Sequence, residues 1–241
     1  MSLGSDSTIL ISVDVSTDSQ PIQSLVDLFQ SVDVILIGYY PSQGEVAPAR
    51  VRQERKSEAT STLEEIADVF RTSGVNVTET LVFAYYRQDS IDYAAKKYGC
   101  DAVLTLGEAE SIERILTPIR GDTNLERIVG LLESIMRESD TSVTFFHSVM
   151  EDTNPSHGEF LVRGAADRLT QAGIDRDRVD WRLSNDESPE GEIIQLGEEH
   201  DLLVLGETKP SLRHRILGSV PTRIVDEVDT PAFVVRDTNA G

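Results

Sequence analysis

The stretch Leu202-Leu203-Val204-Leu205-Gly206 decides the fold, because it repeats the pattern of Ala102-Val103-Leu104-Thr105-Leu106-Gly107 in the other half of the chain. Each stretch is a short, continuous apolar run that ends at a glycine, which is typical of a strand buried on both faces of a parallel sheet. Two earlier apolar runs, which begin near Ile9 and Ile115, correspond in the same way and give an internal period of roughly 106 residues. The sequence therefore predicts two related halves.

Short apolar runs alternate with longer amphipathic segments in both halves, and this alternation predicts parallel sheets with right-handed crossovers. In the first half we expect strands over residues 8–13, 34–37, 75–85 and 102–107, helices over 20–30, 63–70 and 91–98, and a loop over 42–55. In the second half we expect strands over 115–119, 143–147, 178–183, 202–206 and 232–235, and helices over 125–136, 158–172, 190–200 and 221–228.

Only the second half continues to a fourth helix and a fifth strand. The predicted fold class is α/β, with two doubly wound parallel-sheet domains in tandem. We place the domains at residues 1–112 and 113–241, and the first of them lacks the last helix and the last strand.

The charge balance is strongly acidic. The chain has 42 aspartates and glutamates against 22 lysines and arginines, which gives a formal charge of −20 and a pI near 4.5. Only four of the basic residues are lysines, and such a surface suits a protein in high salt, where self-repulsion is screened. An extreme halophile is the leading interpretation of the source, and an ordinary acidic protein is the alternative. The same charge argues against a nucleic acid or an anionic membrane as the main partner.

One cysteine, Cys100, excludes an internal disulfide and is typical of a reducing compartment. We interpret it as a small buried residue at the end of a helix. The chain contains no run of 18 apolar residues, so no membrane-inserted segment is expected. These features together predict a cytoplasmic protein.

Two residues at strand ends are candidates for ligand binding, because ligands of open parallel sheets bind outside the carboxyl ends of the strands. Asp14 follows the first strand and could accept hydrogen bonds from a ribose or an adenine, or it could cap the following helical region. Arg120 stands at the equivalent place in the second half. It could bind a phosphate or a carboxylate, or form a salt bridge with one of the many acids.

The segment from Gly206 to Val220 is the most basic part of the chain, and it lies between a buried strand and a predicted helix. Glycines let a backbone approach a phosphate, and a helix start favours an anion. The matching segment of the first half, residues 107–111, is acidic and unsuited to a phosphate. The candidate anion-binding residues of this segment are Gly206, Thr208, Lys209, Gly218, Ser219 and Val220.

No catalytic or metal-binding residues are predicted. The four histidines have no metal-ligand spacing with one another or with the cysteine. Ser219 and His214 lack a third group that would orient them as a nucleophile and its base.

The quoted residues resemble the universal stress protein family over both halves. That family has an aspartate at the end of its first strand, like Asp14. Its last βα loop has the pattern glycine, two residues, glycine, nine residues, glycine, and serine or threonine. Gly206, Gly218 and Ser219 match this pattern, whereas Lys209 replaces the second glycine and the loop is one residue short.

The resemblance implies a sheet order of 3-2-1-4-5 in a full domain, and a site for ATP or another phosphate-bearing ligand in some members. The departures at Lys209, at Arg120 and in the loop length favour a lost or altered nucleotide site. We therefore predict a stress-response or regulatory binding module with a nucleotide or other anion as ligand. Its protein partner would be a transporter or a signalling protein.

Two other hypotheses stay open. One is an ATP-binding protein or slow ATPase that uses the loop of the second half. The other is a structural role in which the tandem imitates the dimer formed by single-domain relatives, with a homodimer as a further partner arrangement.

Overall fold

The computed structural model describes residues 7–17, 23–42, 44, 46–122, 124–149, 155–185, 188–207 and 219–236. The chain divides into two compact units, which we call the first unit (Met1–Leu104) and the second unit (Thr105–Gly241). Each unit has its own core and is described by itself. The limits of the predicted domains, residues 1–112 and 113–241, stay a prediction.

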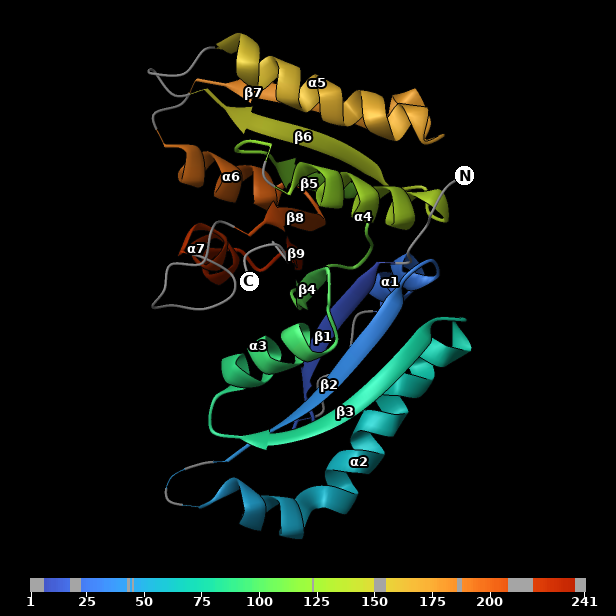
Figure 1. Ribbon diagram of the computed structural model, residues 1–241, viewed down its shortest axis with the longest axis vertical. Coiled ribbons are helices and arrows are strands. Elements are labelled where there is room, and N and C mark those ends of the chain that lie inside the picture. The colour runs from blue at the N-terminus through green and yellow to red at the C-terminus, as the bar shows by residue number, and fades with distance from the viewer. Residues whose placement is uncertain are drawn as a thin grey trace. The chain divides into compact units, whose positions relative to one another are not determined.

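The first unit is a parallel sheet in the order β3-β2-β1-β4, with helices between the strands (Figure 1). β1 is buried along nearly its whole length, as its continuous apolar sequence predicts. The elements are β1 (Thr8–Asp14), α1 (Gln23–Val26), a 3-10 helix η1 (Asp27–Phe29), β2 (Asp33–Pro41), α2 (Pro48–Thr72), β3 (Asn76–Ala84), α3 (Arg87–Lys97) and β4 (Ala102–Thr105).

The loop expected over residues 42–55 is wrong in its second half, because α2 begins at Pro48. Proline is favoured at the first helical position, but the side chains up to residue 58 are exposed or half-exposed and carry no apolar stripe. The first buried residue of the helix is Ala59. The early turns are held instead by ion pairs within the helix, such as Arg50–Glu54 at 3.1 Å.

The second unit is a parallel sheet in the order β7-β6-β5-β8-β9. This order is the doubly wound 3-2-1-4-5 arrangement that the family resemblance implies, and the predicted α/β fold class is confirmed. The elements are β5 (Arg114–Pro118), α4 (Leu125–Arg137), β6 (Ser142–Ser148), α5 (Pro155–Gln171), a 3-10 helix η2 (Arg176–Arg178), β7 (Val179–Ser184), α6 (Pro189–Glu198), β8 (Leu202–Gly206), α7 (Ser219–Glu227) and β9 (Ala232–Val235).

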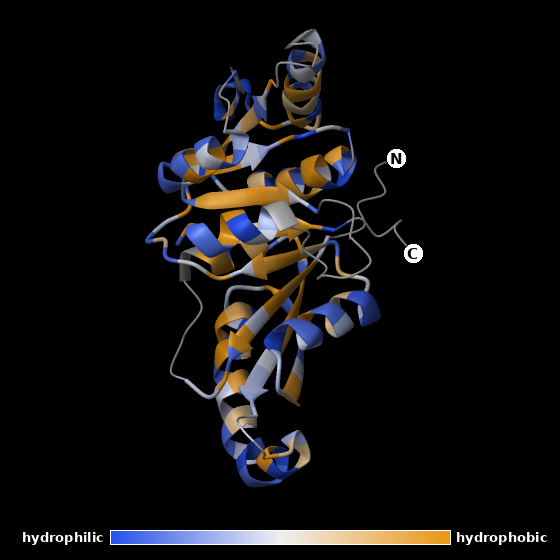
Figure 2. Cartoon of the chain, turned by 90° about the vertical axis from the view of Figure 1, so that its left-hand side faces the viewer, coloured by the Kyte–Doolittle hydropathy of each residue, from blue (hydrophilic) through white to orange (hydrophobic). Residues whose placement is uncertain are grey.

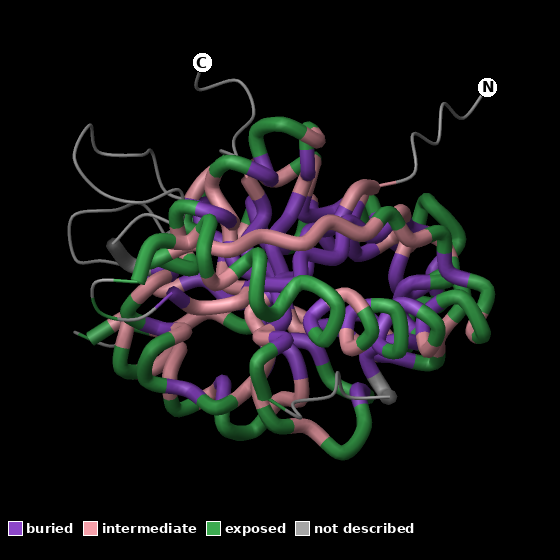
Figure 3. The backbone as a smooth tube through the Cα atoms, turned by 90° about the horizontal axis from the view of Figure 1, so that it is seen from below, coloured by how far each residue is buried: buried purple, intermediate pink, exposed green. Residues whose placement is uncertain are grey.

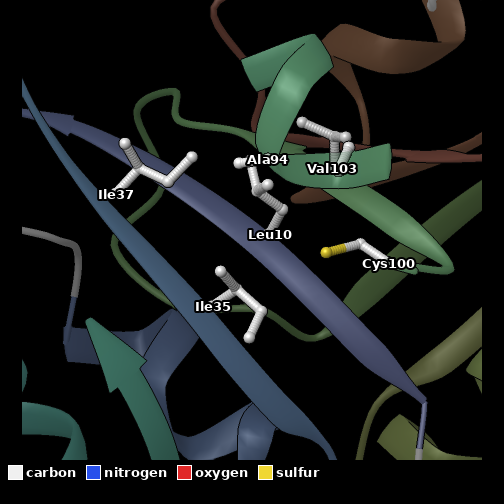
Figure 4. Close-up of a cluster of buried hydrophobic side chains, with 7 residues drawn as sticks. Leu10, Ile35, Ile37, Ala94, Cys100 and Val103 are labelled. Carbon is white, nitrogen blue, oxygen red and sulfur yellow. The ribbon is translucent and has the colours of Figure 1, made fainter. Parts of the chain in front are cut away.

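Each unit has a hydrophobic core between its sheet and its helices. In the first unit α3 packs on β1, β2 and β4, and Cys100 lies fully buried among aliphatic side chains (Figure 4). In the second unit α6 and α7 pack on β5, β6, β8 and β9 through a similar apolar cluster. Figure 2 shows that the strands are largely apolar, and Figure 3 marks the buried residues in purple.

The same aspartate hydrogen bonds recur in both units. In the first unit the backbone N–H of Thr8 donates to Oδ2 of Asp101 at 3.0 Å. In the second unit the backbone N–H of Arg114 donates to Oδ2 of Asp201 at 2.8 Å. Each aspartate thereby ties the start of the first strand of its unit to the start of the fourth. Asp101 and Asp201 each stand directly before one of the two matching apolar runs, residues 102–107 and 202–206.

The described residues contain no helix that is both long enough and apolar enough to cross a bilayer.

Candidate functional site

The place for a ligand in a doubly wound sheet is the crevice outside the carboxyl ends of the strands where the strand order reverses. In the first unit this crevice lies between β1 and β4, and in the second unit between β5 and β8. The residues that follow β1, β5 and β8 therefore determine what each unit can bind.

Asp14 closes a local turn at the end of β1. Its Oδ1 accepts hydrogen bonds from the backbone N–H of Ser16 at 2.9 Å and from the Ser16 hydroxyl at 2.6 Å. These hydrogen bonds close a turn over residues 14–16 and are not a helix cap, because the next helix among the described residues, α1, begins at Gln23. A contact from Asp14 to a ligand stays a prediction.

Arg87 places a guanidinium over the end of β1. Its Nε donates to the Ser12 hydroxyl at 3.1 Å, and its Nη2 donates to the Ser12 carbonyl oxygen. Partial burial of the guanidinium lowers the pKa of Arg87, while the neighbouring Asp14 and Tyr39 act in the opposite direction. The protein's own cation therefore occupies the edge of the sheet where an anionic ligand of the first unit would bind.

Tyr39 completes this group of polar side chains, which we call the first-unit cluster (Ser12, Asp14, Tyr39 and Arg87). The ring is buried, and its hydroxyl lies 3.2 Å from the carbonyl oxygens of both Ala84 and Tyr85. Burial raises the pKa of the Tyr39 hydroxyl, and the Asp14 carboxylate raises it further.

The Tyr39 pKa predicts a loss of stability at high pH. Because the folded protein holds this proton longer than the unfolded chain, the stabilisation is complete below pH about 10 and is lost as the pH rises through the folded pKa. In denaturant unfolding between pH about 9 and 11, we expect the free energy of unfolding to fall more steeply for the wild type than for Tyr39→Phe. Equal slopes would show that Tyr39 does not titrate differently on folding. At neutral pH the variant should lose about 1 kcal/mol with the hydroxyl hydrogen bond.

In the second unit, the crevice between β5 and β8 is bridged by Asn124. This residue has a left-handed backbone (φ 63°), and its Nδ2 donates to the carbonyl oxygen of Glu207 at 3.2 Å. Its side chain consequently does not cap α4, which begins at Leu125. Glu207 is itself buried, and its backbone N–H donates to the carbonyl oxygen of Val235 at 2.7 Å.

Arg120 lies exposed at the carboxyl end of β5. Within the described part of the chain it forms no ion pair, so the salt bridge considered for it does not occur there. The backbone just before it is fixed, because the Ile119 carbonyl oxygen lies 2.6 Å from Nδ1 of the buried His147. Arg120 therefore follows a backbone segment that is held by His147, in the connection between β5 and α4.

The predicted glycine loop is described only at its two ends. Gly206 ends β8, and a Cβ there would lie 3.3 Å from Cδ1 of Ile128. Ser219 and Val220 form the start of α7. Thr208, Lys209 and Gly218 lie outside the described residues, so their role stays a prediction.

Asn124 and Arg87 were missed by sequence reasoning, and Glu207 was not among the candidate binding residues. Glu207 directly follows β8, and Asn124 lies in the connection between β5 and α4. A polar residue after a strand that borders the crevice is the signal that could have found them. Arg87 comes from the segment after β3, and only the folded sheet brings it to β1. No group of three or more His, Cys, Asp and Glu side chains that could hold a metal occurs in the described ranges.

The comparisons with known proteins agree with this architecture. No protein-family model matches the chain, and no curated protein matches its sequence. Among solved structures, a universal stress protein from Archaeoglobus fulgidus DSM 4304 matches with a TM-score of 0.65 over 96% of this chain and 97% of that one. The fold is that of the universal stress proteins. The sequence identity of 14% shows the fold alone.

A second structure with the universal stress protein fold, from Pseudomonas aeruginosa UCBPP-PA14, matches with a TM-score of 0.59 and 11% identity over 98% of this chain and 95% of that one. An Archaeoglobus fulgidus universal stress protein solved in complex with dAMP matches 52% of this chain and 98% of its own, with a TM-score of 0.41 and 15% identity. A likeness of that size says nothing about a ligand of this chain.

Proposed function

We propose that this chain is a regulatory binding module with the universal stress protein fold, in which the nucleotide site is altered and the second unit binds a phosphate-bearing anion. The observation that carries the proposal is the 3.2 Å hydrogen bond from Asn124 to the Glu207 carbonyl oxygen. This one contact has two consequences, one for the shape of the crevice and one for the start of α4.

The first consequence concerns space. The bond joins the β5–α4 connection to the residue that follows β8, so it crosses the crevice at the point where a doubly wound sheet receives its ligand. The Glu207 end is held in turn by Val235 on β9. A base and ribose would have to displace this bridge, whereas a phosphate at the rim would not.

The second consequence concerns charge. Because the Asn124 side chain is engaged elsewhere, the N-terminus of the 13-residue helix α4 has no side-chain cap from it. An uncapped helix start favours an anion, and the exposed guanidinium of Arg120 stands at the end of the preceding strand. In a chain with a formal charge of −20, Arg120 supplies the positive charge that this proposal requires, and it acts beside the acidic residues Asp122 and Glu126 of the same segment.

The first unit gives separate support for an altered nucleotide site. There the edge of β1 is occupied by Arg87, which donates two hydrogen bonds to Ser12. One polar side chain in each unit, Arg87 or Asn124, thus holds the chain's own backbone. A transporter or signalling protein as partner stays a prediction.

The proposal is tested by thermal unfolding in about 1 M salt, with and without inorganic phosphate. A ligand at 100 times its Kd adds about 2.7 kcal/mol of stability, which corresponds to a rise in Tm of roughly 5–10 °C for a chain of this size. We expect phosphate to raise the Tm of the wild type and Arg120→Ala to remove most of that rise. Arg137→Ala, at the other end of α4, is the matched control and should respond like the wild type. An unchanged Tm in the wild type would overturn the anion site.

The alternative of an ATP-binding protein or slow ATPase depends on residues 208–218. Its signature would be ATP hydrolysis above background that is lost in Gly218→Val. If that activity is present, the second unit is an enzyme and the regulatory proposal is wrong.

A further inference from the structure

The outer edge of β3 carries backbone groups that have no hydrogen-bond partner among the described residues. β3 is the edge strand of the first-unit sheet, and none of its nine residues is buried. The Ser42 N–H donates to the Ala84 carbonyl oxygen at 3.0 Å, and β2 and β3 pair in parallel register from Asp33↔Asn76 to Pro41↔Ala84. Backbone groups alternate in direction along a strand, so the even-numbered residues of β3 face β2. The residues whose N–H and C=O groups face away from the sheet are therefore Val77, Glu79, Leu81 and Phe83.

The corresponding edge of the second unit is blocked by the chain's own side chains. There β7 is the edge strand next to β6, and its outward groups are those of the odd-numbered residues by the same reasoning. Nη1 of Arg176 donates to the Val179 carbonyl oxygen, and the Trp181 N–H donates to Oδ1 of Asp180 at 2.8 Å. Side chains that fill an edge in this way prevent a further strand from pairing there.

No such protection is present at β3 among the described residues. The strand sequence NVTETLVFA contains no proline and no lysine, which are the residues that usually prevent pairing at an edge. Its one charged residue, Glu79, forms an ion pair with Arg71, whose Nη2 lies 3.1 Å from the carboxylate and whose Nη1 pairs with Asp68. A nine-residue edge with apolar and β-branched side chains is a template for another strand.

We propose that β3 pairs in antiparallel orientation with β3 of a second copy of this chain. In the register that joins all four outward residues, Val77 lies opposite Phe83 of the other copy and Glu79 lies opposite Leu81. Thr80 then lies on the two-fold axis. The strand is complementary to itself in this register, because each hydrogen-bonded pair is made twice and the two Glu79 carboxylates are not opposite each other. This self-complementarity is the reason to assign the edge to a second copy.

The net charge makes this pairing dependent on salt. Two copies with a formal charge of −20 each repel one another in dilute buffer. The Debye length falls to about 3 Å at 1 M salt, so the repulsion is screened there while the backbone hydrogen bonds persist. We therefore expect a dimer that forms in molar salt and dissociates as salt is removed.

Sedimentation velocity in about 1 M salt tests the interface, because the repulsion between the two copies is screened beyond about 3 Å under these conditions. The wild type should sediment as a dimer and Leu81→Pro as a monomer, because proline removes an outward N–H but no hydrogen bond to β2. Leu81→Ala, which loses the side chain but keeps the N–H, should remain a dimer. A monomeric wild type, or equal dimerisation of Leu81→Pro and Leu81→Ala, would refute the proposal.

A cysteine cross-link tests the register without depending on the folding of the proline variant. Residues 80 of the two copies form a non-hydrogen-bonded pair with Cα atoms about 4.5 Å apart, which is within the disulfide range. Thr80→Cys should therefore form a covalent dimer on mild oxidation. Thr78→Cys, which lies opposite Val82 of the other copy, should not. Cys100 is fully buried and does not compete. Cross-linking at 78 in place of 80, or at neither, would contradict this pairing.

Discussion

Gly107→Ala is expected to lower the free energy of unfolding by about 3 kcal/mol, because a Cβ at this position would overlap backbone atoms. It would lie 2.5 Å from the Pro231 nitrogen and 2.6 Å from the Thr230 carbonyl carbon. Backbone atoms cannot rotate away as a side chain can. The approach is also fixed by a hydrogen bond, since the Glu108 N–H donates to the Asp229 carbonyl oxygen at 2.6 Å.

Denaturant unfolding in high salt measures this effect, and Gly121→Ala is the matched control. A Cβ at residue 121 meets no atom within 4 Å, so that variant should stay within about 0.5 kcal/mol of the wild type. If Gly107→Ala is as stable as Gly121→Ala, the close approach of Gly107 to residues 229–231 is wrong.

Gly158→Ala should lower the free energy of unfolding by about 2 kcal/mol, because a Cβ at this position would overlap the ring of His147. The new Cβ would lie 2.8 Å from Nε2 of His147 and still closer to Cδ2. The imidazole cannot turn aside freely, because its Nδ1 is held 2.6 Å from the Ile119 carbonyl oxygen. α5 would therefore have to move away from β6.

Gly164→Ala on the same helix provides the control, because a Cβ there meets nothing within 4 Å. That variant should gain about 0.5–1 kcal/mol from helix propensity. In the His147→Ala background, Gly158→Ala should lose its penalty, and a double-mutant cycle measures this coupling. An unchanged penalty in that background would show that His147 is not the obstacle.

Much of the fold could be predicted from the sequence because parallel strands are apolar on both faces. The runs at residues 202–206 and 232–235 coincide with β8 and β9. The start of α2 could not be found in this way. Its first turns contact little of the core, so no apolar periodicity marks them, and only the position of Pro48 and the i,i+4 charges indicate a helix.

The candidate site was predictable at the level of strand ends and not at the level of partners. Asp14 and Arg120 lie at the carboxyl ends of β1 and β5 as expected. Their neighbours come from distant segments: Arg87 reaches β1 from the start of α3, and Asn124 reaches the residue after β8. A contact between residues that are 83 positions apart leaves no local pattern in a single sequence.

The most direct test of the altered nucleotide site compares Mg-ATP with inorganic phosphate at equal concentration. The measurement is the shift in Tm that each ligand causes in molar salt. Under the proposal that the Asn124–Glu207 hydrogen bond obstructs a base while an anion binds at the rim, we expect ATP to raise the Tm no more than phosphate does. A rise with ATP that exceeds the phosphate rise by roughly 5–10 °C, equivalent to about 2.7 kcal/mol, would contradict this and show an intact nucleotide site.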